Sequence, residues 1–206
     1  MNIIETYSDN VRFHPRIGGN YTQGIYGKKV LVLGESIYCC VKCNTPEVCK
    51  NQIKDIVKKQ LDGEEKNPFY TLIPKLYIGD INKPFQIEEK IEFWNKVSFY
   101  EFIQTSVGIA DRVRPTLEMW NDAVNPFFEI LDILEPQVVL ITGKELSNYV
   151  VRLFEERKKV FDSEKSFLIH NEVLYKNRNI DLVCIYHPSS GRLSYNIQEE
   201  LFKIVK

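Results

Sequence analysis

The sequence predicts an α/β fold: a three-layer α/β/α sandwich in which a central, mostly parallel β-sheet lies between two layers of helices. Short apolar runs without a polar interruption recur along the chain, as at 30–33 and 138–141. A strand that is buried on both faces has this composition, which is typical of a parallel sheet covered by helices. Segments with helical spacing of apolar residues separate the runs. Strands that alternate with helices imply such a sandwich.

The overall composition is that of one folded domain spanning residues 1–206. The chain has 206 residues, of which 44% are hydrophobic and 12% aromatic, enough to bury a substantial core. The net charge of −1 argues against an overall electrostatic attraction to nucleic acid or membrane, although a local basic groove remains compatible with it. No apolar run is long enough to span a bilayer, and the N-terminus lacks the pattern of a signal peptide. We therefore expect a cytoplasmic protein.

The elements follow in chain order. Residues 1–27 are rich in glycine and aromatic residues and predict an irregular N-terminal arm. The first strand is Val30–Leu33, and Gly34 ends it with a sharp turn. Residues 51–61 carry one apolar stripe at helical spacing, with Gly63 as a stop. The later expected elements are a helix or aromatic loop at 67–75, helices at 87–95, 114–134, 144–157 and 195–205, and strands at 96–102, 137–142, 166–174 and 180–186.

Two breaks are predicted inside this pattern. Pro126 implies a kink or break in the helical segment 114–134, because proline cannot donate a backbone hydrogen bond. Residues 177–179, Asn-Arg-Asn, form a turn between the last two strands.

Polar residues follow the first and the last apolar strand directly. Glu35, Ser36 and Tyr38 come after the first strand, whereas His187 opens a loop after the last one. Ligands of open α/β sheets collect at the carboxyl ends of strands. We therefore expect these two segments to meet at one edge of the sheet. The loop also holds Ser189, Ser190, Gly191 and Arg192, whose hydroxyls, N–H groups and charge suit a phosphate.

The two segments together resemble motifs of the uracil-DNA glycosylase superfamily. The first motif is Gly34-Glu35-Ser36-Ile37-Tyr38, the second is His187-Pro188-Ser189-Ser190, and the resemblance in element order runs from Lys28 to Gly191. It implies an enzyme that flips a base out of DNA and hydrolyses its N-glycosidic bond, with uracil or another damaged or modified base as substrate. It also implies DNA as partner and no cofactor. We expect a monomer.

The resemblance implies a role for each matched residue. Gly34 and Glu35 would contact the base, and Tyr38 would exclude the thymine methyl group. His187 would stabilise negative charge on the base oxygen as the bond breaks. The remaining implied roles are phosphate binding by Ser189 and Ser190 and an apolar wedge, Leu193, that fills the gap left by the flipped nucleotide.

The chain departs from the family pattern at two positions. Ser36 stands where active members carry an Asp that orients water, so this role is weakened or passes to Glu35 or Glu101. Glu101 maps to the base-reading Asn, and a carboxylate there would accept hydrogen bonds from amino or imino groups. This puts uracil in question and leaves room for a modified cytosine. Spacing does not fix the stacking aromatic, for which Phe69 and Tyr70 are candidates.

Two other functions compete with the enzyme hypothesis. The departures also fit a catalytically inactive nucleic-acid-binding module on the same fold. A small-molecule hydrolase or nucleotide-binding protein has less support, because the chain contains neither a Gly-x-Ser-x-Gly elbow nor a phosphate-loop motif.

Four of the five cysteines are crowded just after the first motif, at Cys39, Cys40, Cys43 and Cys49. The Cys40-x-x-Cys43 spacing suits a zinc or iron–sulfur site, with reduced structural thiols as the alternative. Basic residues in loops and at element ends form either a path for a phosphate backbone or scattered surface charge. These residues are Lys28, Lys29, Arg112, Arg114, Lys144 and Arg192.

Overall fold

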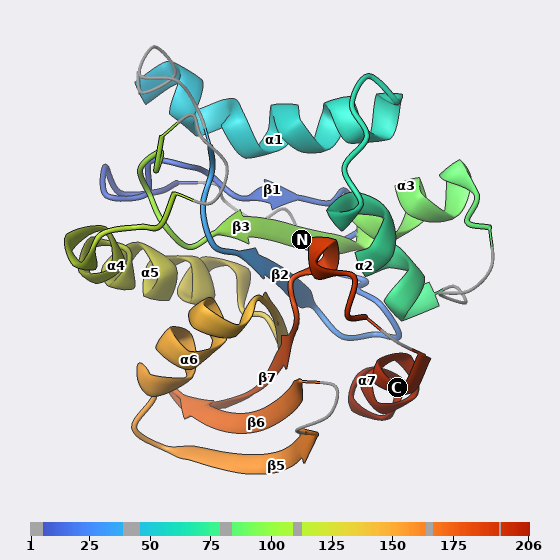
Figure 1. The fold of residues 1–206 in the computed structure, drawn as a ribbon. Helices are drawn as coiled ribbons and strands as arrows, with labels where there is room; N and C mark the ends of the chain where they lie inside the picture. The colour runs from blue at the N-terminus through green and yellow to red at the C-terminus, as the bar shows by residue number, and fades with distance from the viewer. Residues whose placement is uncertain (1–5, 39–45, 79–83, 109–112, 164–166, 194) are drawn as a thin grey trace.

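A computed structural model describes residues 6–38, 46–78, 84–108, 113–163, 167–193 and 195–206 of the chain. Within these residues, seven strands form one sheet in the order β1-β3-β2-β4-β7-β6-β5 (Figure 1). The strands are β1 (Arg16–Ile17), β2 (Val30–Gly34), β3 (Val97–Glu101), β4 (Val138–Thr142), β5 (Arg157–Ser163), β6 (Leu168–Tyr175) and β7 (Arg178–Ile185). The fold is therefore mixed α/β, and the predicted α/β fold class is confirmed.

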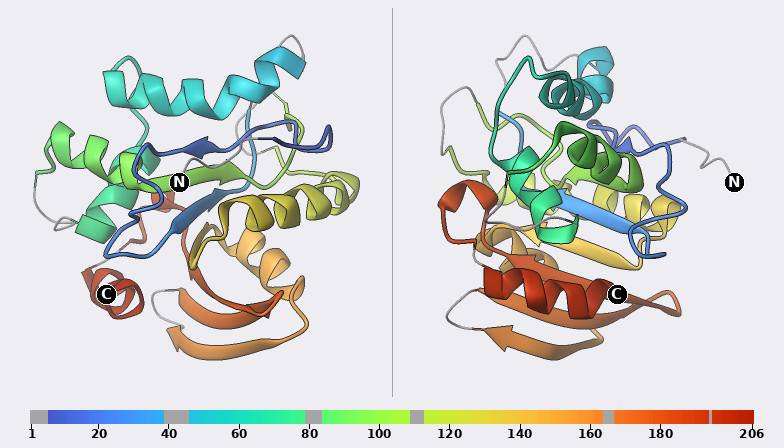
Figure 2. Two further views of the ribbon diagram at one scale, coloured as in Figure 1. Left: turned by 180° about the vertical axis from the view of Figure 1, so that it is seen from behind. Right: turned by 90° about the vertical axis from the view of Figure 1, so that its right-hand side faces the viewer.

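Helices pack on both faces of the sheet. They are α1 (Pro46–Asp62), α2 (Phe69–Ile78), α3 (Ile87–Lys96), α4 (Leu117–Asp122), α5 (Val124–Leu134), α6 (Lys144–Arg152) and α7 (Tyr195–Val205), with a 3₁₀ turn, η2, at Pro188–Ser190. Phe99 of β3 contacts the rings of α2 and α3. Tyr100 points to the opposite face, since successive strand residues alternate, and lies near Glu129 of α5. Figure 2 shows α1 beside the β1 edge and β5 at the far edge.

The prediction of a mostly parallel sheet is correct for the centre and wrong for the edges. Strands β3, β2, β4 and β7 are parallel to one another. Strand β1 runs antiparallel to β3, and β5, β6 and β7 form an antiparallel meander. The reason is the turn between β6 and β7: only Lys176 and Asn177 connect them, both with positive φ (47° and 63°). A two-residue turn of this type can join only antiparallel strands.

The expected helix at 144–157 is too long. Helix α6 ends at Arg152, and residues 157–163 form the edge strand β5. Five of the seven positions of β5 are exposed and none is buried, so its sequence carries no alternation of apolar and polar residues. Lysines on an exposed edge, here Lys158 and Lys159, discourage pairing with another chain.

The helical segment 114–134 is divided, as predicted, but not at the predicted residue. The break falls at Ala123 between α4 and α5. Pro126 lies inside the first turn of α5, where its missing N–H removes no helical hydrogen bond.

The N-terminal arm is part of the core. Val11, Phe13, Tyr21 and Ile25 are each no more than 2% exposed, and the Tyr21 hydroxyl donates to the Leu134 carbonyl at 3.2 Å. The arm also contributes β1 to the sheet, an element that the sequence pattern did not predict. Among the described residues, no helix combines the length and apolar character needed to cross a membrane.

Candidate functional site

The register of the sheet brings the two predicted segments to the same edge. Gly34 pairs with Glu101 across β2 and β3, and Thr142 pairs with Ile185 across β4 and β7. Leu33 pairs with Ile141. The carboxyl ends of all four strands are therefore aligned at one edge of the sheet. Adjacent strands are about 4.8 Å apart, and β7 is two strands away from β2. His187, two residues after β7, therefore emerges at the edge where Glu35 leaves β2.

Two adjacent aromatic residues of α2 lie near this edge, one beside His187 and the other near Glu101. Phe69, at the start of α2, lies with its ring centroid 5.6 Å from that of His187 and 5.0 Å from that of Tyr70. The charge of Glu101 contributes to a raised pKa of Tyr70, after the larger effect of burial. Figure 1 shows η2 beside α2, and the two are in contact. Phe69 and Tyr70, the predicted stacking candidates, both belong to this edge.

Gly34 makes room for the Glu101 carboxyl group. A Cβ atom added to Gly34 would lie 2.7 Å from the Glu101 carboxyl carbon, which is far closer than van der Waals contact. The Oε2 atom of Glu101 is buried and has no hydrogen-bond partner among the described residues. Burial, followed by repulsion from Glu35, raises the pKa of Glu101 well above that of a free glutamate.

Arg114 connects Glu35 to α6. Its guanidinium donates to Glu35 Oε2 at 3.0 Å and also pairs with Glu145. Burial raises the pKa of Glu35, Arg114 opposes this effect, and Glu145 adds to it. The sequence did not single out Glu145, because an acidic residue in the first turn of a helix is common and needs no ligand to explain it.

Backbone hydrogen bonds hold the two segments after β2 and β3 side by side. The N–H groups of Phe102 and Ile103 donate to the carbonyls of Gly34 and Glu35, both at 2.9 Å. The Gln104 side chain donates to the Glu101 carbonyl at 2.8 Å and accepts from the Phe13 N–H at 3.1 Å. The Gly34-Glu35 segment is thus fixed by main-chain contacts that do not depend on a ligand.

The contacts of His187 favour a neutral imidazole whose Nε2–H can donate a hydrogen bond. The Ser189 N–H donates to His187 Nδ1 at 3.3 Å, and the Ser189 hydroxyl lies 2.7 Å from the same nitrogen. A backbone N–H can only donate, so Nδ1 carries a lone pair and the ring proton is on Nε2. Burial lowers the pKa of His187, which favours this neutral form, although much of the residue remains exposed.

The remaining predicted residues follow the same strands at this edge. Ser189 and Ser190 are exposed, and the Ser190 hydroxyl accepts from the Arg192 N–H at 3.3 Å. The Arg192 guanidinium lies 5.2 Å from the Tyr186 ring centroid. Tyr38 is 43% exposed and Ser36 is half-buried. Leu193, the expected wedge, is partly buried and packs against the core.

The predicted basic path is wrong for two of its members. Lys28 and Lys29 precede β2 and therefore lie at the opposite, amino edge of the sheet. Lys28 donates to the Ile204 carbonyl at 2.5 Å, and Lys29 pairs with Glu135 at 3.3 Å. Lys144, in contrast, follows β4 at the candidate edge. Arg112 lies outside the described residues.

The cysteine cluster is only partly described. Cys39, Cys40 and Cys43 lie outside the described residues. Cys49 is fully buried in α1. Over the described part of the chain, no three or more His, Cys, Asp or Glu side chains are grouped so that they could hold a metal ion.

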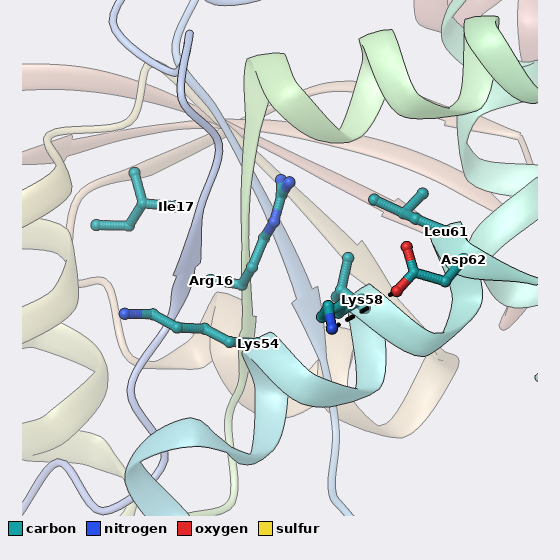
Figure 3. A pocket seen from close by; sticks show the side chains of 7 residues that line it. Arg16, Ile17, Lys54, Lys58, Leu61 and Asp62 are labelled. Carbon is teal, nitrogen blue, oxygen red and sulfur yellow. Dashed lines mark ion pairs between the residues drawn. The ribbon is translucent and has the colours of Figure 1, made fainter. Parts of the chain in front are cut away.

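A separate cleft of about 290 Å³ lies between β1 and α1 (Figure 3). Lys58 and Asp62 form an ion pair across one turn of α1 at 3.7 Å. The charged ends of Arg16 and Lys54 point in different directions in this view. The cleft contains none of the residues that the sequence motifs single out.

Compared with known proteins, the chain matches no family model and no curated protein. The functional argument therefore depends on the site itself.

Proposed function

We propose that this protein is a DNA glycosylase that hydrolyses the N-glycosidic bond of uracil or another damaged base, and that its fold is the three-layer sandwich of the uracil-DNA glycosylase superfamily. One observation carries the proposal: a neutral histidine and a Gly-Glu segment leave parallel strands at the same edge, with the Phe69 ring beside the histidine. A flipped nucleobase needs both a polar and an aromatic contact surface.

The chemistry follows from the state of His187. When the glycosidic bond breaks, negative charge develops on the oxygens of the departing base. The Nε2–H of a neutral imidazole can donate a hydrogen bond to such an oxygen, and it is preorganised by the Ser189 contacts at Nδ1. Glu35 is the residue best placed to orient water, because Ser36 carries no charge. Exposed hydroxyls at Ser189 and Ser190 would hold DNA phosphates. This chemistry needs no cofactor.

The second candidate is a nucleic-acid-binding module without catalytic activity. Arg114 engages Glu35 in an ion pair, and an engaged carboxylate is a poorer base for water. This module would bind DNA with a strong salt dependence and release no base.

Excision assays distinguish the two candidates. The substrates are single- and double-stranded oligonucleotides that carry uracil, hypoxanthine, xanthine or a modified cytosine. The glycosylase proposal predicts base release that falls about 10²- to 10³-fold in His187→Ala, the usual effect of removing one preorganised donor. Lys158→Ala, on the distant β5 edge, serves as the control and should excise normally. No release from any substrate, or equal release by His187→Ala, would refute the enzyme.

A further inference from the structure

We propose that Arg114 exchanges partners when nucleic acid binds: its guanidinium leaves Glu35 for a backbone phosphate, and Glu35 then becomes available to act on water. The inference rests on the proposed function, because it describes how the same site would engage its substrate. Arg114 belongs to neither of the two motifs that resemble the glycosylase superfamily.

Arg114 lies at the rim of the candidate edge and spans the ends of two adjacent parallel strands. Its partner Glu35 follows β2, and its partner Glu145 lies in the first turn of α6, which follows β4. The exposed fraction of the side chains rises outward, from 15% for Glu35 to 49% for Arg114 and 61% for Glu145. A ligand that approaches this edge therefore meets the guanidinium before it meets Glu35.

The ion pairs of Arg114 depend on one nitrogen atom. Among the described residues, both contacts of this side chain are made by Nη2, which donates to Glu35 Oε2 at 3.0 Å and also pairs with Glu145. Neither carboxylate therefore forms the bidentate contact of a strong arginine pair. Exposed ion pairs of this kind contribute little to stability, so a competing anion can replace them. A phosphate suits this role, because it can accept two parallel hydrogen bonds from one guanidinium.

The exchange requires movement of the Arg114 side chain only. The next residue, Pro115, is buried, and Thr116 caps α4 by accepting from the Met119 N–H at 3.3 Å. These contacts anchor the main chain directly after Arg114. The long side chain can still rotate about its own bonds, which is how a half-exposed arginine reaches alternative partners.

Loss of the ion pair changes the basicity of Glu35. The described charged groups around this carboxylate are Arg114, Glu145 and Glu101. Burial raises the pKa of Glu35, Arg114 lowers it, and Glu145 raises it. When Arg114 leaves, the pKa therefore rises, and a carboxylate with a raised pKa is a better proton acceptor. In the proposed reaction, the water oxygen bonds to the sugar carbon, the glycosidic electron pair leaves with the base, and the water proton passes to Glu35.

The salt dependence of binding tests the phosphate contact without any requirement for catalysis. The probe is a single-stranded oligonucleotide of thymine, whose affinity is measured over a series of salt concentrations. The slope of log K against log salt should be smaller by about 0.7 in Arg114→Ala than in wild type, because one phosphate contact is lost. Arg152→Ala removes the same charge from an exposed position at the far end of α6 and should keep the wild-type slope. An unchanged slope in Arg114→Ala would overturn the inference.

The titration of Glu35 tests the exchange itself. In wild type, the bound strand should raise the pKa of Glu35 by the combined effect of the added phosphates and the departure of Arg114, as measured by ¹³C NMR. In Arg114→Ala the rise should be smaller, because only the effect of the phosphates remains. Arg114→Lys keeps an exchangeable charge and should retain most of the wild-type rise. If Arg114 were only a structural link, it would stay with Glu35 and the rise would be equal in wild type and Arg114→Ala.

The kinetics separate this inference from the proposed function. Where a base is released, Arg114→Ala should raise KM and keep kcat within about threefold of wild type, because Glu35 has already lost its ion pair in the complex. An equal fall in kcat and kcat/KM would contradict the exchange. If the expected slope and titration occur without base release, the glycosylase proposal fails and this inference stands. If bases are released but Arg114→Ala keeps the wild-type slope, the reverse holds.

Discussion

Gly34 leaves open the space that the Glu101 carboxyl group occupies. The sequence shows only a glycine at the end of an apolar strand, and the structure shows which side chain requires it. The Glu101 carboxyl group occupies the space that any other residue at position 34 would need. The identity of one residue is therefore set by another that lies on a neighbouring strand.

This arrangement predicts that Gly34→Ala is destabilising, because the Glu101 carboxyl group must move out of the way. Overpacking costs about 1–3 kcal/mol in the free energy of unfolding, and we expect the lower end of that range because a flexible side chain can shift; urea denaturation measures it. Gly19→Ala is the matched control, because nothing lies within 4 Å of a Cβ at that position, and it should change stability by less than about 0.5 kcal/mol. The double variant Gly34→Ala/Glu101→Ala should recover much of the loss. Purely additive effects would show that the two residues do not collide.

Arg114 predicts a specific change at Glu35. Arg114 lowers the pKa of Glu35 against the raising effect of burial, so Arg114→Ala should raise that pKa further. A ¹³C NMR titration of the carboxyl carbons measures the shift directly. Arg152→Ala, an exposed arginine at the end of α6, should leave the Glu35 titration in place. An unchanged or lowered pKa in Arg114→Ala would contradict the assignment of the ion pair.

At the scale of elements, the β6–β7 turn explains why the last strand reaches the candidate edge. The turn reverses the chain within two residues, and β7 then runs parallel to β4 and delivers His187. Local sequence predicted both strands and the turn. It did not predict the direction of the pairing, since an Asn-rich turn is compatible with several turn types.

The turn geometry predicts different effects for the same substitution two residues apart. Asn177→Val places a β-branched residue at φ 63° and should cost about 1–3 kcal/mol. Asn179→Val, at an exposed position inside β7, should be neutral or slightly stabilising, since valine favours strands. Thermal unfolding of both variants provides the comparison. Equal effects would mean that the turn does not require its left-handed conformation.

For the whole molecule, the raised pKa of Glu101 should make the free energy of unfolding depend on pH. The raised pKa means that the folded chain keeps a proton that the unfolded chain releases. Stability attributable to this residue should therefore fall as pH rises above the ordinary glutamate value, by up to about 1.4 kcal/mol per pH unit. Glu101→Gln cannot ionise and should become more stable than wild type by a margin that grows with pH. Urea unfolding from pH 5 to pH 8 measures the margin. A constant margin would mean that Glu101 ionises normally in the folded state.

Local patterns predicted more of the fold than of the site. The apolar runs at β2 and β4, the alternating aromatic-rich segment at β3 and the apolar stripe of α1 identified their elements, because burial determines where apolar residues recur in the sequence. Strand β5 was missed because it is exposed. The Glu35–Arg114–Glu145 cluster was missed for a different reason: its members are distant in sequence, Arg114 lying 79 residues from Glu35. The sequence around Glu35 gives no indication that Arg114 pairs with it, and the sequence around Arg114 gives none of Glu35.

The central claim is that the Gly34-Glu35 segment and the His187-Ser189 segment form one site. The most direct measurement is a ¹H–¹⁵N NMR titration with a single-stranded oligonucleotide that carries uracil, compared with the same strand carrying thymine. The account predicts that the uracil strand shifts the amide signals of Glu35, Glu101 and Ser189 together, with one dissociation constant, while the thymine strand has a weaker effect. Shifts confined to only one of the two segments, or identical shifts with both strands, would contradict it.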